Sequence, residues 1–293
     1  MAALTPDLQI ASPAPAKPFP GFLQAVLLIG LYVFFQVVFV LPFRSFDRVA
    51  HTQLGRHPVV YALVVFAAGG VVIWVAREWR GRTFRQIAGP PAPLAVYLWT
   101  LVTMFGLLMF ELPVMVWLSR RFPSFVPDLN LGLERSAWGA FLLAVVAAPL
   151  IEETIFRGIF LKGFMARYGT WRGIWLSAAF FGAVHLSFLR LIPTVSLGLL
   201  AGWMCWRTRS IWPGVLAHAA NNSLAVLAVV GGSAPKGQLG KFSWGEVVIS
   251  VGGATVLAYG IDGLRQAFAG IVYPEPADPQ SSGSGCGTDS EIS

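Results

Sequence analysis

The sequence predicts an all-α fold: a polytopic integral membrane bundle of about eight transmembrane helices. Of the 293 residues, 56% are hydrophobic and only 12% are charged, about half the charged fraction of a soluble globular domain. The ranges 22–43, 58–76 and 173–189 contain no Asp, Glu, Lys or Arg. A bilayer core of about 30 Å requires about 20 such residues in a helix, so a soluble protein is excluded.

Eight apolar segments are expected to form the helices. In chain order they are 22–43, 58–76, 94–118, 137–164, 173–189, 191–206, 211–231 and 245–266. The fourth begins as an apolar run at Ala137 and then carries Glu152, Glu153 and Arg157. Since an ionisable group inside a membrane helix costs about 3 kcal/mol on insertion scales, this helix is the first candidate for a functional site.

The chain divides into five parts around these helices. Residues 1–20 are Pro-rich and lack the pattern of a removable signal peptide, so a flexible N-terminal segment is expected. Residues 21–136 hold the first helices, 137–231 the polar-bearing core, and 232–272 a loop and the last helix. The acidic, Pro/Ser/Gly-rich tail 273–293 is expected to be disordered.

The charge of +7 is explained by the membrane. The Arg residues fall in short runs between apolar segments, as the positive-inside rule predicts, so the partner is a lipid bilayer and no nucleic acid is expected. A slight excess of Lys and Arg on the N-terminal side of alternating loops places both termini in the cytoplasm. The expected location is the bacterial inner membrane.

Two glutamates and one arginine in the fourth helix have different expected roles. Glu153 and Arg157 stand at i, i+4 with the acid first, the favoured orientation for a helical ion pair. Glu152 is rotated by about 100° from Glu153, so it is expected to point elsewhere in the bundle. A carboxylate without a cationic partner in a dry site suits a general base. The alternative is that both glutamates only mark an interfacial helix end.

Histidines in two later helices could join this glutamate. His185 follows Phe181 by one turn, and His218 precedes Asn222 by one turn. Each could instead make an interhelical hydrogen bond. At 1.5 Å per residue, however, Glu152, both histidines and Asn222 lie about 10 to 20 Å from their helix ends. The similar depth of these polar side chains in the membrane favours one water-accessible chamber that they share.

Three motifs carry a family resemblance. The stretches EETIFR (Glu152–Arg157), FGAVH (Phe181–His185) and HAANN (His218–Asn222) occur in this order. They resemble the EExxxR, FxxxH and HxxxN motifs of the CAAX prenyl endopeptidase and bacteriocin-processing (CPBP) family, whose members include type II CAAX prenyl endopeptidase-like proteins. The resemblance covers about residues 137–231 and implies a helical intramembrane peptidase with its catalytic core there.

The resemblance implies a role for each motif residue. Glu152 would activate the attacking water, assisted by His185. His218 and Asn222 would stabilise the oxyanion. Glu153 with Arg157 would hold the helix and orient Glu152, and Phe181 would pack beside the catalytic histidine.

Metal dependence is a separate question. Glu152, His185 and His218 with a water would make up a catalytic zinc site of the His₂Glu type, but the sequence has no HExxH motif and fixes no further shell of ligands. The metal-free glutamate mechanism is therefore favoured and no cofactor is expected, with zinc as the alternative.

The predicted function is hydrolysis of a peptide bond in a membrane-associated peptide or protein, in CAAX-type processing or in bacteriocin maturation and self-immunity. The alternative is a non-catalytic scaffold or a proton-coupled transporter. Glu111, which belongs to none of the three motifs, is the best argument for the transporter. The sequence leaves the substrate, the cleavage site, the biological process and the oligomeric state open.

Overall fold

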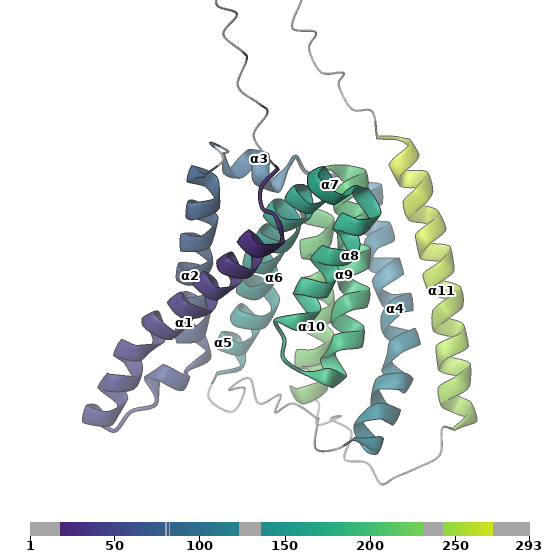
Figure 1. Ribbon diagram of the computed structural model, residues 1–293. Helices are drawn as coiled ribbons and strands as arrows, with labels where there is room; N and C mark the ends of the chain where they lie inside the picture. Colours follow the sequence, from purple (N-terminus) through teal and green to yellow (C-terminus); the bar gives the residue numbers. More distant parts are fainter. Residues whose placement is uncertain (1–17, 80, 82, 123–135, 231–242, 272–293) are drawn as a thin grey trace, which may run out of the picture.

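The computed structural model is a bundle of helices (Figure 1). The residues it describes are 18–79, 81, 83–122, 136–230 and 243–271. Within these ranges there is no strand, which confirms the all-α prediction. The predicted flexible segment 1–20, apart from its last three residues, and the predicted tail 273–293 lie outside the described residues.

All eight predicted segments are helical. Seven of them correspond to α1 (Phe22–Ala50), α2 (Pro58–Glu78), α4 (Leu94–Arg121), α8 (Thr170–Ala183), α9 (Phe188–Thr208), α10 (Trp212–Val230) and α11 (Trp244–Ala269). The predicted fourth segment is one continuous rod composed of α5 (Ala137–Phe141), η3 (Leu142–Ala147), α6 (Ala148–Glu153), η4 (Thr154–Leu161) and α7 (Lys162–Tyr168). Two short helices were not predicted, η1 (Leu54–Arg56) and α3 (Phe84–Ala88).

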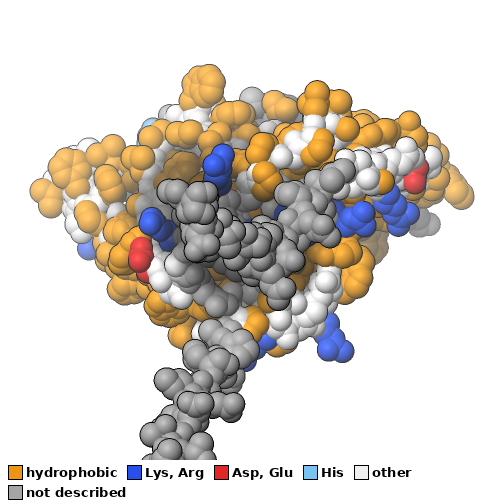
Figure 2. Space-filling view, turned by 90° about the horizontal axis from the view of Figure 1, so that it is seen from above, with side chains coloured by type: hydrophobic (Ala, Val, Ile, Leu, Met, Phe, Trp, Pro, Cys, Tyr) orange, Lys and Arg blue, Asp and Glu red, His pale blue; other side chains and the backbone are white. Residues whose placement is uncertain are grey.

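The helices are those of an integral membrane protein. In the described parts of the chain, six are long and apolar enough to cross a bilayer, namely α1, α2, α4, the rod, α9 and α11. At 1.5 Å per residue the 14 residues of α8 reach only about 21 Å, less than the about 30 Å of hydrocarbon. Apolar side chains cover most of the periphery in the view from above (Figure 2), as contact with lipid requires.

The helices are arranged around the rod and α8 to α10. In Figure 1, α1 and α2 lie on one flank and α4 and α11 on the other. α1 begins and α11 ends in the upper half of the same view. The cytoplasmic placement of the termini stays a prediction.

The predicted segment 173–189 ends earlier than expected. α8 stops at Ala183, and His185 lies in a turn before α9. Leu186 adopts a left-handed conformation with φ 47°, and the hydroxyl of Ser187 accepts a hydrogen bond from the backbone N–H of Arg190. A serine cap starts α9 here, so the expectation that His185 lies within a helix is wrong.

The rod is wider than an α-helix on both sides of the paired glutamates. η3 and η4 are π-helical, and Glu152 and Glu153 end the short α-helical stretch between them. π-Turns are rare and occur frequently at functional sites.

Glycines allow α4 and α11 to approach closely. A Cβ on Gly253 would collide with the backbone nitrogen of Phe110, and one on Gly106 with that of Leu257. The adjacent Gly252 has no atom within 4 Å of such a Cβ. The α4–α11 contact therefore depends on particular glycines.

We expect Gly253→Ala to destabilise the bundle by about 1–3 kcal/mol, because the added methyl must displace a backbone. Gly252→Ala, the matched control on the same helix, is expected to change stability by less than about 0.5 kcal/mol. Thermal unfolding in detergent measures both. Equal midpoints for the two variants would contradict the close α4–α11 packing.

Candidate active site

The imidazole of His218 lies between the two neighbouring glutamates. Its Nδ1 is 3.1 Å from Oε1 of Glu153, a hydrogen bond, and its Nε2 is 3.9 Å from Oε2 of Glu152. The expectation that Glu152 points away from Glu153's surroundings is therefore wrong, because α10 inserts one ring between the two carboxylates. The separation of 3.9 Å is too long for a direct hydrogen bond.

Glu153 and Arg157 form the predicted ion pair, with Nε of Arg157 3.1 Å from Oε2 of Glu153. Both side chains have no exposed surface. The pair is brought close to α10 by Gly214, where a Cβ would lie 2.9 Å from Oε2 of Glu153. Arg157, Glu153 and His218 thus form a buried chain of contacts that ends beside Glu152.

The ring of Phe181 is the apolar centre of the site. The guanidinium of Arg157 lies 4.5 Å from the ring centroid, a cation–π contact. The rings of His218 and His185 meet Phe181 edge-on, at centroid distances of 5.3 Å and 5.1 Å. Phe181 therefore lies beside both histidines.

His185 has a local partner. Its Nδ1 is 2.8 Å from the carbonyl oxygen of Phe181, which fixes the ring against the end of α8. In the described part of the chain, no hydrogen bond or ion pair joins His185 to Glu152. The FxxxH motif meets the EExxxR motif where Phe181 contacts Arg157. The histidine next to Glu152 is His218.

Asn222 connects α10 to the wide part of the rod. Its Nδ2 donates to the carbonyl oxygen of Ala144 in η3 at 2.7 Å, and its Oδ1 accepts from Nδ2 of Asn221 at 3.2 Å. An amide nitrogen carries two hydrogens, so one N–H of Asn222 has no hydrogen-bond partner among the described residues.

Glu152 is the glutamate of the site that is not ion-paired with Arg157. Its side chain is 18% exposed, and Oε2 is buried without a hydrogen-bond partner among the described residues. The half-buried phenol of Tyr32, from α1, lies within electrostatic range of this carboxylate. Sequence reasoning missed Tyr32 because a tyrosine in an apolar helix has no distinctive spacing.

The three residues of the zinc alternative do not make up a metal-ion cluster. Within the described ranges, no group of three or more His, Cys, Asp and Glu side chains could hold a metal ion. His185 and His218 each contact the Phe181 ring edge-on instead.

Glu111 lies apart from these residues. It is buried in α4, and its carboxyl group lies near the hydroxyl of Ser196 of α9. No described contact links it to Glu152, so the structure shows no chain of hydrogen bonds between the two carboxylates.

The family comparison covers the same region as the three motifs. Residues 134–224 match the family described as "Type II CAAX prenyl endopeptidase Rce1-like". This part of the chain is similar to the Rce1-like family. The Rce1-like region contains every motif residue from Glu152 to Asn222, and the match confirms the family that the motifs predicted.

Two curated proteins are similar over shorter stretches. One, named "Putative membrane peptidase YdiL", is from Bacillus subtilis (strain 168) and is 26% identical over 86 residues, which are 29% of this chain and 35% of that protein. The other, an "Uncharacterized 24.3 kDa protein" of Escherichia coli, is 32% identical over 107 residues, 35% of this chain and 46% of that protein. The chain spans less than half the length of these relatives, and no solved structure matches it.

We expect Arg157→Met to cost about 3–5 kcal/mol of stability, because it leaves the buried Glu153 carboxylate without its cation. The double variant Glu153→Gln/Arg157→Met is expected to recover part of this loss, since no unpaired charge remains. Arg120→Met is the control. It breaks a partly exposed ion pair with Glu246, worth at most about 1 kcal/mol.

Thermal unfolding of the purified variants in detergent measures these effects. An Arg157→Met midpoint equal to that of Arg120→Met would show that the buried pair does not stabilise the site.

Proposed function

We propose that the protein is an intramembrane endopeptidase that hydrolyses a peptide bond in a membrane-associated peptide or protein. The observation that carries this proposal is the Glu152 carboxylate, which has a buried oxygen without a hydrogen-bond partner and faces the His218 ring. The Rce1-like match and the relative named as a membrane peptidase support the same activity. The substrates belong to CAAX-type processing or to bacteriocin maturation and self-immunity.

In the proposed first step, Glu152 accepts a proton from a water molecule as the water oxygen bonds to the scissile carbonyl carbon. The carbonyl π electrons move to oxygen, which becomes an oxyanion. His185 assists by hydrogen-bonding the attacking water. A carboxylate that makes no hydrogen bond has an acceptor site available for this proton.

Two donors are proposed to stabilise the oxyanion. In its protonated form, His218 donates from Nδ1 to Glu153 and keeps Nε2–H for the oxyanion. Asn222 donates one N–H to Ala144 and keeps the other. When the C–N bond breaks, the proton on Glu152 passes to the leaving nitrogen. Every group in this scheme comes from the chain itself, so the proposed mechanism uses no metal and no other cofactor.

The remaining groups of the site are proposed to position the residues that take part in the reaction. Glu153, held by Arg157, fixes the direction of the His218 ring, and Phe181 separates the two histidines. The proposed setting is the bacterial inner membrane with both termini in the cytoplasm.

We expect Glu152→Gln to abolish cleavage in cells without preventing insertion, because an amide cannot take the proton from water. The measurement compares new protein termini in membranes of cells that express the wild type or the variant at equal levels. Termini found only with the wild type identify the substrates. Glu111→Gln is the control and is expected to leave all of these termini in place.

If no terminus differs between wild type and Glu152→Gln, the scaffold or transporter alternative gains instead. A phenotype lost in Glu111→Gln and kept in Glu152→Gln would favour the transporter, because Glu111 lies outside the peptidase motifs.

We expect Asn222→Ala to lower kcat on such a substrate by about 10²–10³-fold, the usual effect of removing an oxyanion donor, with little change in KM. Asn221→Ala is the matched control on the same helix and is expected to stay within about fivefold, because it contacts the site only through Asn222. Steady-state kinetics of the purified variants measure both. Equal losses in the two variants would contradict the role of Asn222.

A further inference from the structure

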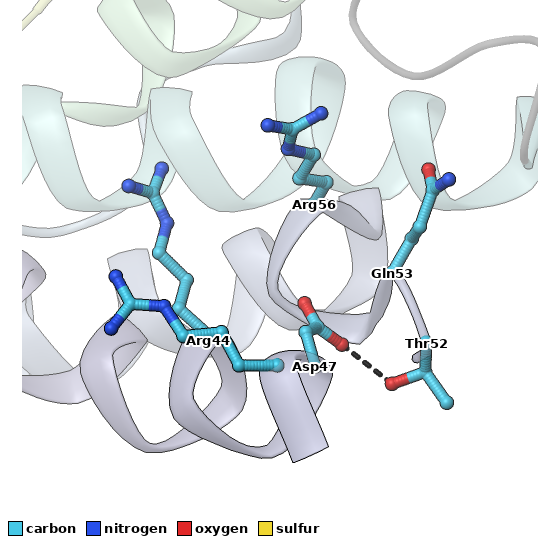
Figure 3. Close-up of a pocket in the computed structure, with 6 residues that line it drawn as sticks. Arg44, Asp47, Thr52, Gln53 and Arg56 are labelled. Atoms are coloured by element: carbon cyan, nitrogen blue, oxygen red, sulfur yellow. Dashed lines mark hydrogen bonds between the residues drawn. The ribbon is translucent and has the colours of Figure 1, made fainter. Parts of the chain in front are cut away.

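A polar hollow of about 360 Å³ lies where α1 ends and η1 leads toward α2 (Figure 3). In the view of Figure 1 this end of α1 projects from the lower part of the bundle, away from the start of the helix. The lining residues are Arg44, Asp47, Arg48, Thr52, Gln53 and Arg56. None of them belongs to the three motifs of the candidate active site.

Asp47 uses its carboxylate to hold the loop. One oxygen accepts hydrogen bonds from the Thr52 hydroxyl at 2.6 Å and the Leu54 N–H at 2.7 Å, and the other accepts from the Gly55 N–H at 2.7 Å. Figure 3 shows the carboxylate turned toward Thr52. These bonds give the loop a fixed shape and make Asp47 a structural acid.

The hollow therefore has an excess of positive charge. Three arginines and one aspartate line it, a formal charge of +2 by subtraction. Arg44 donates to the hydroxyl of Tyr61 at 3.1 Å, which holds this guanidinium in place, and Arg48 is exposed. Among the described residues, Asp47 is the only carboxylate that lines the hollow. Planar guanidinium groups match the oxygen geometry of phosphate.

The surroundings of the hollow indicate where such a phosphate would come from. α1 and α2 are both long and apolar enough to span a membrane, so the loop between them lies at the level of the lipid headgroups. Phe46 and Val49 beside the arginines are 52% and 82% exposed. Exposed apolar groups next to cations suit a lipid, whose acyl chains and headgroup meet at this depth.

We propose that Arg44, Arg48 and Arg56 form a phosphate-binding site that takes the headgroup of an anionic phospholipid or a free phosphate at the membrane surface. Asp47 fixes the shape of the loop and Tyr61 holds the Arg44 guanidinium before the anion arrives, and the exposed Arg48 and Arg56 close on it. Binding anchors the projecting end of α1 at the membrane surface. The site is independent of the proposed peptidase activity.

The test is native mass spectrometry of the full-length protein in detergent, with three probes: dihexanoyl phosphatidylglycerol, dihexanoyl phosphatidylcholine and inorganic phosphate. Arg48→Gln is expected to weaken binding of phosphatidylglycerol about fivefold, and Arg48→Gln/Arg56→Gln about 25-fold, as the loss of one and two basic residues near a lipid surface predicts. Arg172→Gln, an exposed arginine at the start of α8, is the matched control and keeps wild-type binding. Arg48→Lys is expected to recover most of the affinity.

The probes separate the two sources of phosphate. Tighter binding of phosphatidylglycerol than of inorganic phosphate assigns the site to lipid, and equal binding assigns it to free phosphate. If phosphatidylglycerol and phosphatidylcholine bind alike, and neither phosphatidylglycerol nor inorganic phosphate responds to the Arg48 and Arg56 substitutions while the variants keep wild-type thermal stability, the proposal is overturned.

Discussion

The arrangement of the candidate site depends on one buried ion pair. Glu153 and Arg157 have no exposed surface, and removing two charges from water costs several kcal/mol for each ion unless partners compensate. The contacts come from two other helices: the Nδ1 of His218 and the close approach at Gly214 belong to α10, and the ring face of Phe181 belongs to α8. The contacts of the pair therefore link the rod, α8 and α10. The motifs that carry chemistry are also those that hold the core in place.

Because Arg157 pairs with Glu153, the neighbouring Glu152 has no arginine against its carboxylate in the described part of the chain. Glu153 is ion-paired with Arg157 through Oε2 and hydrogen-bonded to His218 through Oε1, whereas the buried Oε2 of Glu152 has neither a hydrogen-bond partner nor an arginine beside it among the described residues. Two adjacent carboxylates are thus divided into one that is structurally occupied and one that can take part in chemistry. Such a division between neighbouring acids is a recurrent way to assign roles in an active site. The π-turns on both sides of these residues widen the rod where the division occurs.

Much of the fold and part of the site could be predicted from the sequence. Apolar length identified all eight helical segments, and the i, i+4 spacing identified the Glu153–Arg157 pair. Two features could not be predicted. The position of His185 depends on the left-handed Leu186, which overrides an unbroken apolar pattern, and the insertion of His218 between two adjacent glutamates depends on the packing of α10. Helical rotation alone separates Glu152 from Glu153, but a ring with two nitrogens can reach both. Tyr32 comes near Glu152 only through the tertiary packing of α1.

The most direct test of the account is the source of the oxygen in the cleaved product. Purified protein in detergent would cleave a substrate, chosen from termini that require the wild type, in a single turnover in H₂¹⁸O. Attack by a water activated by Glu152 predicts one ¹⁸O in the new C-terminal carboxylate of the first turnover. An unlabelled carboxylate would contradict the account, because it would show that a carboxylate of the protein had attacked the carbonyl and supplied the oxygen. Labelled product from Glu152→Gln at the wild-type rate would contradict it equally, because another group would then activate the water.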